Sequence, residues 1–411
     1  MADPDLDDYR ARARAWVEAN LTPDDGARSV RGSDQTDDDI AAARALQRRL
    51  HDAGWAGIDV PKDYGGQGLT VEHAAAFADA ASGYRLPDFG ILSLVTFGIV
   101  LPTIVAACSE SFKQRHIPRI LAGDELWCQL LSEPGAGSDL AGILTRATRE
   151  GDHWVVQGTK VWSSGAVFAD FGLCITRTDW DVPKHAGLTW FAMPLRAPGA
   201  TVRPIREING GWEFCEAFLD DVVVDADEVM GEVDAGWSFT HTMLVFERGA
   251  LRGDKTEIPA EPAPDLVAAA RRRGTLADPH ARQLIATAHV HDVVRAALVL
   301  RTERAMRRGG GGGALASYLK LAKGIYDPVR ARIGMELGGV DAVAWPSGGE
   351  GALPGIDYLN GRIQSIAGGS NEMQRNGIAE RSLGLPREPS FDRDKPFRQV
   401  LADAQHWKAR S

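Results

Sequence analysis

Glu247 is the carboxylate whose surroundings in this sequence most favour acid–base chemistry. It lies in GWSFTHTMLVFERGALRG, Gly236 to Gly253, and its neighbours one turn away in a helix are all apolar: Met243, Leu244, Ala250 and Leu251. Such a carboxylate either has a cationic partner or has a raised pKa, which suits a general base near neutral pH. Spacing alone leaves both interpretations open and favours the ion pair, because paired buried carboxylates outnumber catalytic ones.

A glycine turn late in the chain is a second candidate site. In SIAGGSNEMQRNGIAERSLGLP, Ser365 to Pro386, two glycines precede a predicted helix that Ser370 is placed to cap and that Gly384 and Pro386 are placed to end. The first N–H groups of a helix lack intrahelical partners, so this start could bind an anion or a polar ligand. The glycines themselves offer no reactive side chain.

Two further segments combine serines with turn glycines. LLSEPGAGSDLAG, Leu130 to Gly142, lacks the third glycine of GxGxxG and a surrounding βαβ unit, so a Rossmann interpretation fails. It is a turn with closely spaced backbone donors and the hydroxyls of Ser132 and Ser138. KVWSSGAVFAD, Lys160 to Asp170, places Trp162 beside two serines, which suits a planar heterocycle, although an indole in a sandwich core is the commoner role.

The composition is that of a globular protein of enzyme size. The chain has 411 residues, of which 44% are hydrophobic and 25% charged. A net charge of −10 without a Lys/Arg block argues against nucleic acid as a partner. The four cysteines form no CxxC pair, so neither a disulfide framework nor a metal site is expected, and the start of the chain is unlike a signal peptide. We therefore expect a cytoplasmic protein.

Hydrophobic periodicity divides the chain into three parts. Residues 1–125 are helical, residues 126–235 contain short β-type runs, and residues 236–411 are helical again. The β runs lie too close together for intervening helices, so the central part is predicted to be an antiparallel sandwich or barrel. Phe89 to Cys108 has twenty residues without a charge, but Gly98 and Pro102 interrupt it. We expect a buried helix pair there and no membrane span.

Four motifs, in this order, resemble those of the acyl-CoA dehydrogenase family: SEPGAGSD, KVWSSGA, FERGA and GGSNEMQRNGIAERSLGLPRE. The resemblance covers about Tyr9 to about Glu388. It implies an N-terminal all-α domain, a central antiparallel β-sandwich or barrel domain and a C-terminal four-helix bundle domain, assembled as a homotetramer or as a heterotetramer with a related subunit. It also implies an FAD-dependent oxidoreductase that introduces an α,β double bond into an acyl-CoA or carrier-protein thioester and passes electrons to an electron-transfer flavoprotein.

The resemblance further implies which residues contact the cofactor and the substrate. Residues expected at the flavin are Gln129, Leu131, Ser132, Ser138, Trp162, Ser163 and Ser164, with Ser164 near N5, the hydride acceptor. Residues expected elsewhere along FAD are Arg273, Thr275, Gly338, Gly339, Ser370 and Glu372. Residues expected at the acyl thioester are Ser138 on the pantetheine arm, Val245, Arg248 and Gly369.

The position of the catalytic base departs from the commonest family pattern. Many members carry a glutamate in a Tyr-Glu-Gly-Thr turn, where this sequence has Ala367 to Ser370, AGGS. Other branches place the glutamate on the helix with the FERGA motif, which matches Glu247. Spacing and resemblance thus nominate the same residue independently, and together they favour the base over the structural ion pair.

A second departure concerns the neighbouring subunit. Family members commonly use an Arg-x-x-Phe-Gly element to reach a partner's FAD, and here Arg273 to Ala277 reads RGTLA, without the aromatic residue. This difference raises the hypothesis of a hetero-oligomer, in which a related subunit supplies the missing FAD contact. Two alternatives to an active dehydrogenase stay open: a catalytically silent partner subunit, and a flavin monooxygenase on the same fold.

Overall fold

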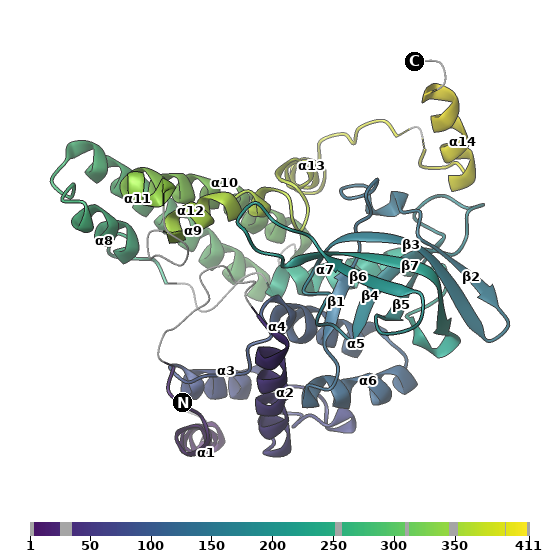
Figure 1. Cartoon of the computed structure of the whole chain (residues 1–411), viewed down its shortest axis with the longest axis horizontal. Coiled ribbons are helices and arrows are strands. Elements are labelled where there is room, and N and C mark those ends of the chain that lie inside the picture. The colour runs from purple at the N-terminus through teal and green to yellow at the C-terminus, as the bar shows by residue number, and fades with distance from the viewer. Residues whose placement is uncertain are drawn as a thin grey trace. The chain divides into compact units, whose positions relative to one another are not determined.

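A computed structural model describes residues 4–24, 35–250, 257–308, 312–344, 352–390 and 392–408 (Figure 1). The chain forms two compact units. The first contains residues 1–207, 211–246 and 391–411, and the second contains residues 208–210 and 247–390. Each unit has a hydrophobic core of its own.

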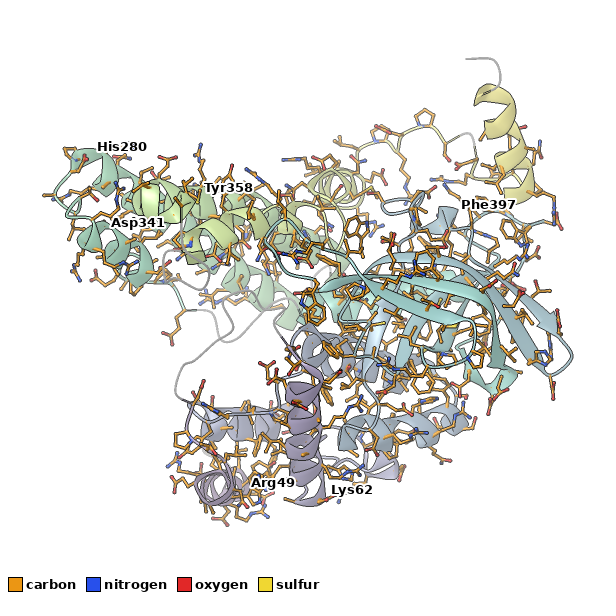
Figure 2. All side chains as sticks on the ribbon, in the orientation of Figure 1. Arg49, Lys62, His280, Asp341, Tyr358 and Phe397 are labelled. Atoms are coloured by element: carbon orange, nitrogen blue, oxygen red, sulfur yellow. The ribbon has the colours of Figure 1, made fainter. Side chains whose placement is uncertain are left out.

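The first unit begins with amphipathic helices: α1 (Pro4–Asn20), α2 (Asp37–Asp52), α3 (Val71–Ala81) and α6 (Glu110–Ala122). Helix α2 starts at a capping box, in which Thr36 accepts a hydrogen bond from the Asp39 amide and the Asp39 carboxylate accepts one from the Thr36 amide. The polar face of α2 carries Arg49 (Figure 2). A buried core formed by α1, α2 and α3 contains Tyr9, Val17, Leu50 and Phe77.

The uncharged segment after α3 is one continuous helical run and not the expected pair of helices. It consists of α4 (Ile91–Ser93), the π-helical η2 (Leu94–Val100) and α5 (Leu101–Ala107). Pro102 falls in the first turn of α5, where the wider π turns before it accommodate a residue without an N–H. The segment is buried as expected, with Leu92 and Ile104 fully enclosed. No helix in the described ranges is long and apolar enough to cross a membrane.

Eight strands follow: β1 (Trp127–Leu130), β2 (Arg146–Glu150), β3 (His153–Ser164), β4 (Phe171–Arg177), β5 (Leu188–Pro194), β6 (Ala200–Pro204), β7 (Phe214–Asp225) and β8 (Val229–Met230). Their order in the sheet is β6-β7-β3-β2-β4-β5-β8, and β1 pairs with β4. Most pairings are antiparallel as predicted, but β1 runs parallel to β4 and β2 meets β4 in parallel at one position. The long connection after β1 permits this parallel pairing, which local strand patterns do not reveal.

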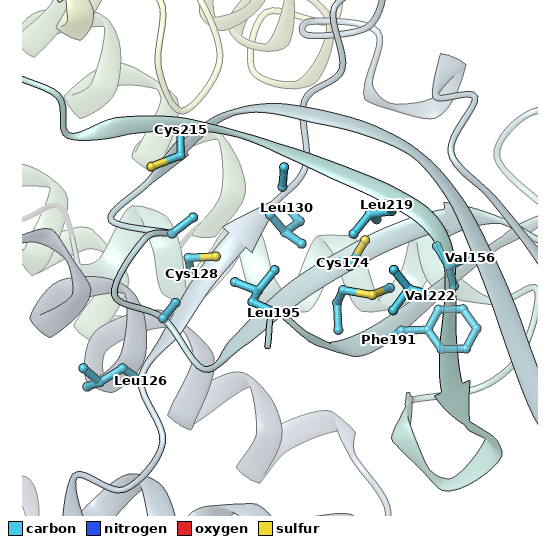
Figure 3. Packing of buried hydrophobic residues seen from close by; sticks show 14 of the residues in the cluster. Leu126, Cys128, Leu130, Val156, Cys174, Phe191, Leu195, Cys215, Leu219 and Val222 are labelled. Atoms are coloured by element: carbon cyan, nitrogen blue, oxygen red, sulfur yellow. The ribbon is translucent and has the colours of Figure 1, made fainter. Parts of the chain in front are cut away.

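The sheet has a well-packed apolar face, part of which is shown in Figure 3: Cys128, Leu130, Val156, Cys174, Phe191 and Val222. All four cysteines are buried free thiols. Burial raises the pKa of Cys174 to about 12, so this thiol stays protonated and behaves as a core residue.

Helices close the chain. Helix α7 (Gly236–Ala250) begins in the first unit, where Trp190 Nε1 donates to the Gly236 carbonyl at 2.8 Å, and α14 (Phe397–Lys408) belongs to the same unit. In the second unit, α10 packs against α8, α9, α12 and α13. Its helices are α8 (Pro264–Arg272), α9 (Pro279–Arg307), α10 (Gly312–Gly338), α11 (Val340–Val343), α12 (Ala352–Asn360) and α13 (Asn371–Arg381). The helical, β and helical order is the predicted one.

Candidate active site

The ends of β1 and β3 lie side by side and gather most of the residues predicted at the flavin. The Val161 amide donates to the Ser132 carbonyl at 2.9 Å, and Lys160 Nζ donates to the Leu131 carbonyl at 3.1 Å. Gln129 lies on β1 just before this junction, and the pair Ser163 and Ser164 ends β3. These two hydrogen bonds, and not a strand pairing, thus bring the SEPGAGSD and KVWSSGA motifs together.

A buried ion pair fixes this junction. Lys160 Nζ lies 2.9 Å from Glu133 Oε1, and the carboxylate also accepts hydrogen bonds from the amides of Leu144 at 2.6 Å and Thr145 at 2.8 Å. Burial raises the pKa of Glu133, but Lys160 and these hydrogen bonds outweigh it and hold the pKa below its usual value. Sequence reasoning missed both residues, although a lysine within a predicted β-type run was the available signal.

Trp162 projects outward on a left-handed backbone. Its φ is 63°, its side chain is 59% exposed, and the β3–β7 pairing is irregular between Lys160 and Ser163. A non-glycine residue in this conformation costs about 1–2 kcal/mol, and such strain concentrates at functional sites. Phe214 contacts the indole edge to face at a centroid distance of 5.9 Å. The alternative role of Trp162 as a sandwich-core indole is therefore wrong, because more than half of this side chain is exposed.

Ser163 and Ser138 differ in their surroundings. Ser163 Oγ is buried and makes no hydrogen bond within the described ranges, which is an unusual state for an enclosed hydroxyl. Ser138 is exposed in the turn after Glu133, where the amide and carbonyl of Glu133 and Ala136 bond each other at 2.9 and 3.0 Å. Its hydroxyl is accessible to a ligand.

Gln129 links β1 to α7. Its Nε2 lies 3.4 Å from Sδ of Met243, which is fully buried. Glu247 follows Met243 by one turn on the same helical face. Val245 is 61% exposed, whereas Leu251 and the side chains of Arg248 and Ala250 lie outside the described residues.

Glu247 has a cation in electrostatic range, which its helix neighbours do not reveal. Lys320 on α10 is buried and donates to the Gln364 carbonyl at 2.6 Å. Burial lowers the pKa of Lys320, Lys323 acts in the same sense, and Asp327 and Glu247 oppose them. The surroundings of Glu247 are thus less apolar than the spacing predicts.

The glycine turn has the predicted helix start and no reactive side chain. Ser370 Oγ accepts from the Met373 amide at 3.3 Å, so the predicted cap of α13 is confirmed. Gly368 and Gly369 have φ values of 64° and 89°, which favour glycine, and buried Gln374 donates to both of their carbonyls at 3.2 Å. Glu372 is exposed and pairs with Arg375.

Arg273 meets the glycine pair at the end of α10. Its Nη1 donates to the Leu337 carbonyl at 3.2 Å, and a Cβ on Gly339 would lie 2.2 Å from its Cζ. Gly339 has a φ of 59°. The second unit thus places Arg273 against Gly339 and the Leu337 carbonyl, whereas the Thr275 hydroxyl donates to the Ala270 carbonyl near the end of α8.

Comparison with known proteins decides the family. Residues 3–124 match the N-terminal domain of acyl-CoA dehydrogenases and residues 128–222 match their middle domain. Acyl-CoA dehydrogenase IpdE1 of Mycobacterium tuberculosis is 35% identical over 387 residues, which cover 93% of this chain and 99% of that protein. The chain belongs to the acyl-CoA dehydrogenase family. It is therefore an oxidoreductase, as the four motifs predicted.

Solved structures confirm the fold class of this acyl-CoA dehydrogenase. The Tcur3481-Tcur3483 steroid ACAD superposes with a TM-score of 0.75 at 28% identity, covering 94% of this chain and 99% of that one. The ChsE4-ChsE5 complex from Mycobacterium tuberculosis superposes with a TM-score of 0.68 at 26% identity, and the match again covers 94% of this chain and 99% of that one.

Acyl-CoA dehydrogenases depend on FAD, and the residues present fit this cofactor. A glutaryl-CoA dehydrogenase from Mycobacterium smegmatis, with a TM-score of 0.60 and 22% identity, was solved in complex with FADH2. In the present acyl-CoA dehydrogenase, the exposed indole of Trp162 and the unbonded hydroxyl of Ser163 suit a planar ring with polar edges. The absence of a side chain at Gly339 lets the guanidinium of Arg273, a predicted FAD contact, lie against the backbone, where a Cβ would clash with it.

Proposed function

We propose that this acyl-CoA dehydrogenase desaturates an acyl-CoA between its α and β carbons, with Glu247 as the base. The observation that carries the proposal is the contact between Gln129 and Met243. Gln129 leads into the flavin-side residues, and Glu247 is one helical turn beyond Met243 on the same face. The turn that carries the base in many relatives has only Gly368 here, which supports the same assignment.

In this proposal the chain's residues position the thioester and remove one proton. FAD, when bound, supplies the acceptor for the hydride that leaves the β-carbon. Glu247 takes the α-proton and becomes neutral as the C–H electrons form the double bond. Lys320 lies in electrostatic range of Glu247. The exposed Ser138 hydroxyl binds the pantetheine arm, with Val245, Arg248 and Gly369 completing the substrate contacts.

For the acyl group we propose a bulky, ring-containing substrate. Support comes from the similarity to a structure described as a steroid ACAD, which covers nearly the whole of both chains. A carrier-protein thioester is the competing form of the substrate.

For partners we propose an electron-transfer flavoprotein as acceptor and a related subunit in a heterotetramer. The missing aromatic residue after Arg273 supports a related subunit, as does the similarity to a structure described as the ChsE4-ChsE5 complex. A homotetramer is the alternative. The four buried free thiols support a cytoplasmic location.

The test is to purify the chain, measure its FAD content, and follow anaerobic bleaching of FAD by short, branched, long and polycyclic acyl-CoA compounds. We expect FAD to be retained and the polycyclic compounds to bleach it fastest. Weak retention, with activity that appears only on co-expression with a relative and is unchanged by Glu247→Gln, would favour the silent subunit. NADH-driven oxygen consumption with a separate reductase would instead favour the monooxygenase.

A further inference from the structure

Arg177, at the end of β4, is a fully buried cation that the proposed reaction does not use. Its Nη1 donates to the Lys184 carbonyl at 2.8 Å and its Nη2 donates to the Ala141 carbonyl. Burial lowers the pKa of Arg177 to about 10, against the opposing effect of nearby carboxylates, so the guanidinium is still charged at neutral pH. Arg177 thereby joins the Leu130–Gly142 segment to the loop between β4 and β5.

The guanidinium of Arg177 also contacts the last described segment of the chain, residues 392–408. It lies 4.1 Å from the ring centroid of Phe397, the first residue of α14 (Figure 2). Phe397 is 3% exposed and stacks on Trp180 at 5.9 Å and 26°.

Backbone bonds hold the same segment on the β4–β5 loop. The Phe397 amide donates to the Val182 carbonyl and the Arg398 amide to the Trp180 carbonyl, both at 2.9 Å. Arg398 Nε lies 2.8 Å from Asp181 Oδ1. Backbone hydrogen bonds, aromatic contacts and an ion pair therefore hold this segment against the β4–β5 loop.

Lys184 makes the second connection. Its Nζ lies 3.0 and 3.1 Å from the two carboxylate oxygens of Asp139 and 2.7 Å from Asp392 Oδ2. The Lys184 side chain is only 12% exposed, whereas that of Asp139 is 60% exposed. Asp139 directly follows Ser138, so a single buried ammonium ties the predicted substrate turn to residues 392–408.

We infer that Arg177, Lys184, Asp392 and Phe397 form a brace that positions the turn at Gly135 to Asp139 for binding the acyl thioester. The inference rests on the proposed function, because Ser138 is the substrate contact in it. A turn with two glycines has high conformational entropy when it is free. If the turn is ordered before the substrate binds, binding no longer carries the entropic cost of ordering it, and the affinity is higher. These are positioning residues. Their loss weakens substrate binding and leaves proton removal by Glu247 intact.

The test compares Lys184→Met with Lys184→Arg in the FAD-loaded full chain. For Lys184→Met we expect KM for the best acyl-CoA to rise about tenfold with kcat within about twofold, the effect of losing one charge-assisted hydrogen bond to a binding loop. Lys184→Arg keeps a cation between the two carboxylates and should recover most of the loss. Lys113→Met is the matched control, because Lys113 is 14% exposed and pairs with Glu110 at 2.8 Å on α6.

Hydrogen exchange gives a readout that does not need turnover. We expect Lys184→Met to increase exchange of the amides of residues 135–142, and Lys113→Met to leave it unchanged. Should Lys184→Met fail to fold, Asp392→Asn, which removes only the distal end of the connection, replaces it with the same expectations. Wild-type exchange in a folded variant overturns the brace. If no acyl-CoA bleaches the FAD of the wild-type enzyme, the proposed function is overturned instead. The hydrogen-exchange result then still decides whether the brace orders the turn.

Discussion

Lys160 and Glu133 form a buried ion pair, with Nζ and Oε1 2.9 Å apart, at the point where β3 meets the segment after β1. The lysine side chain is fully buried and the carboxylate nearly so. The pair fixes the two motifs that carry Ser132 and Trp162. The ion pair therefore sets the geometry of the residues predicted to contact the flavin.

Breaking this pair should be strongly destabilising. Lys160→Met leaves the charge of Glu133 buried without its cation, so we expect the free energy of unfolding to fall by about 3–5 kcal/mol. Urea unfolding at pH 7 measures it. Adding Glu133→Gln removes the orphaned charge and should recover part of the loss. A Lys160→Met variant as stable as the wild type would contradict this account of the junction.

The local chemistry of the sequence was enough to predict much of the fold. The Ser370 cap and the change from helical to β-type runs near residue 126 follow from propensities that act over a few residues. The parallel pairing of β1 with β4 depends on strands more than forty residues apart, and no local pattern carries it.

The candidate site shows the same division. Sequence nominated Trp162 but could not give its outward, left-handed conformation, because that depends on an irregularity in the pairing with β7. It nominated Glu247 from four helix neighbours and missed Lys320, which lies in electrostatic range of it on another helix. Long-range ion pairs such as Lys160 with Glu133 were likewise beyond local reasoning.

Gly339 should not tolerate a side chain. For Gly339→Ala we expect about 1–2 kcal/mol of destabilisation from its φ of 59°, because left-handed backbone disfavours a Cβ. We also expect weaker FAD retention, because the new methyl group would displace the Arg273 guanidinium. Thermal unfolding of the apoprotein and FAD titration separate the two effects. Gly151→Ala, in the β2–β3 turn at a φ of 66° with no atoms near the added Cβ, controls for backbone strain alone. Equal FAD affinity in both variants would contradict the role of Arg273.

Glu213 should make stability fall as pH rises. It lines a small cavity with Phe89, Phe168 and Trp212, and burial, followed by the charge of Glu207, raises its pKa to about 7 from a model-compound value of 4.5. The folded state therefore binds more protons than the unfolded state between these two values. The stabilisation is present below about pH 4.5 and is lost as pH rises through about 7.

Replacing Glu213 by glutamine tests this pH dependence. We expect Glu213→Gln to be more stable than the wild type at pH 8 by about 1–3 kcal/mol and nearly equal to it at pH 5. Chemical denaturation across this range gives the difference directly. A difference that does not change with pH would show that the carboxyl group titrates normally.

Glu247→Gln tests the central claim most directly. The amide keeps the shape of the side chain and cannot accept the α-proton, so FAD should remain bound while its anaerobic bleaching by acyl-CoA slows by about 10²–10⁴-fold. Glu336→Gln is the control, because Glu336 is a 41% exposed glutamate on α10 of the second unit, and it should bleach at the wild-type rate. The account predicts a FAD-loaded Glu247→Gln variant that acyl-CoA barely bleaches. Bleaching of that variant at the wild-type rate would contradict it.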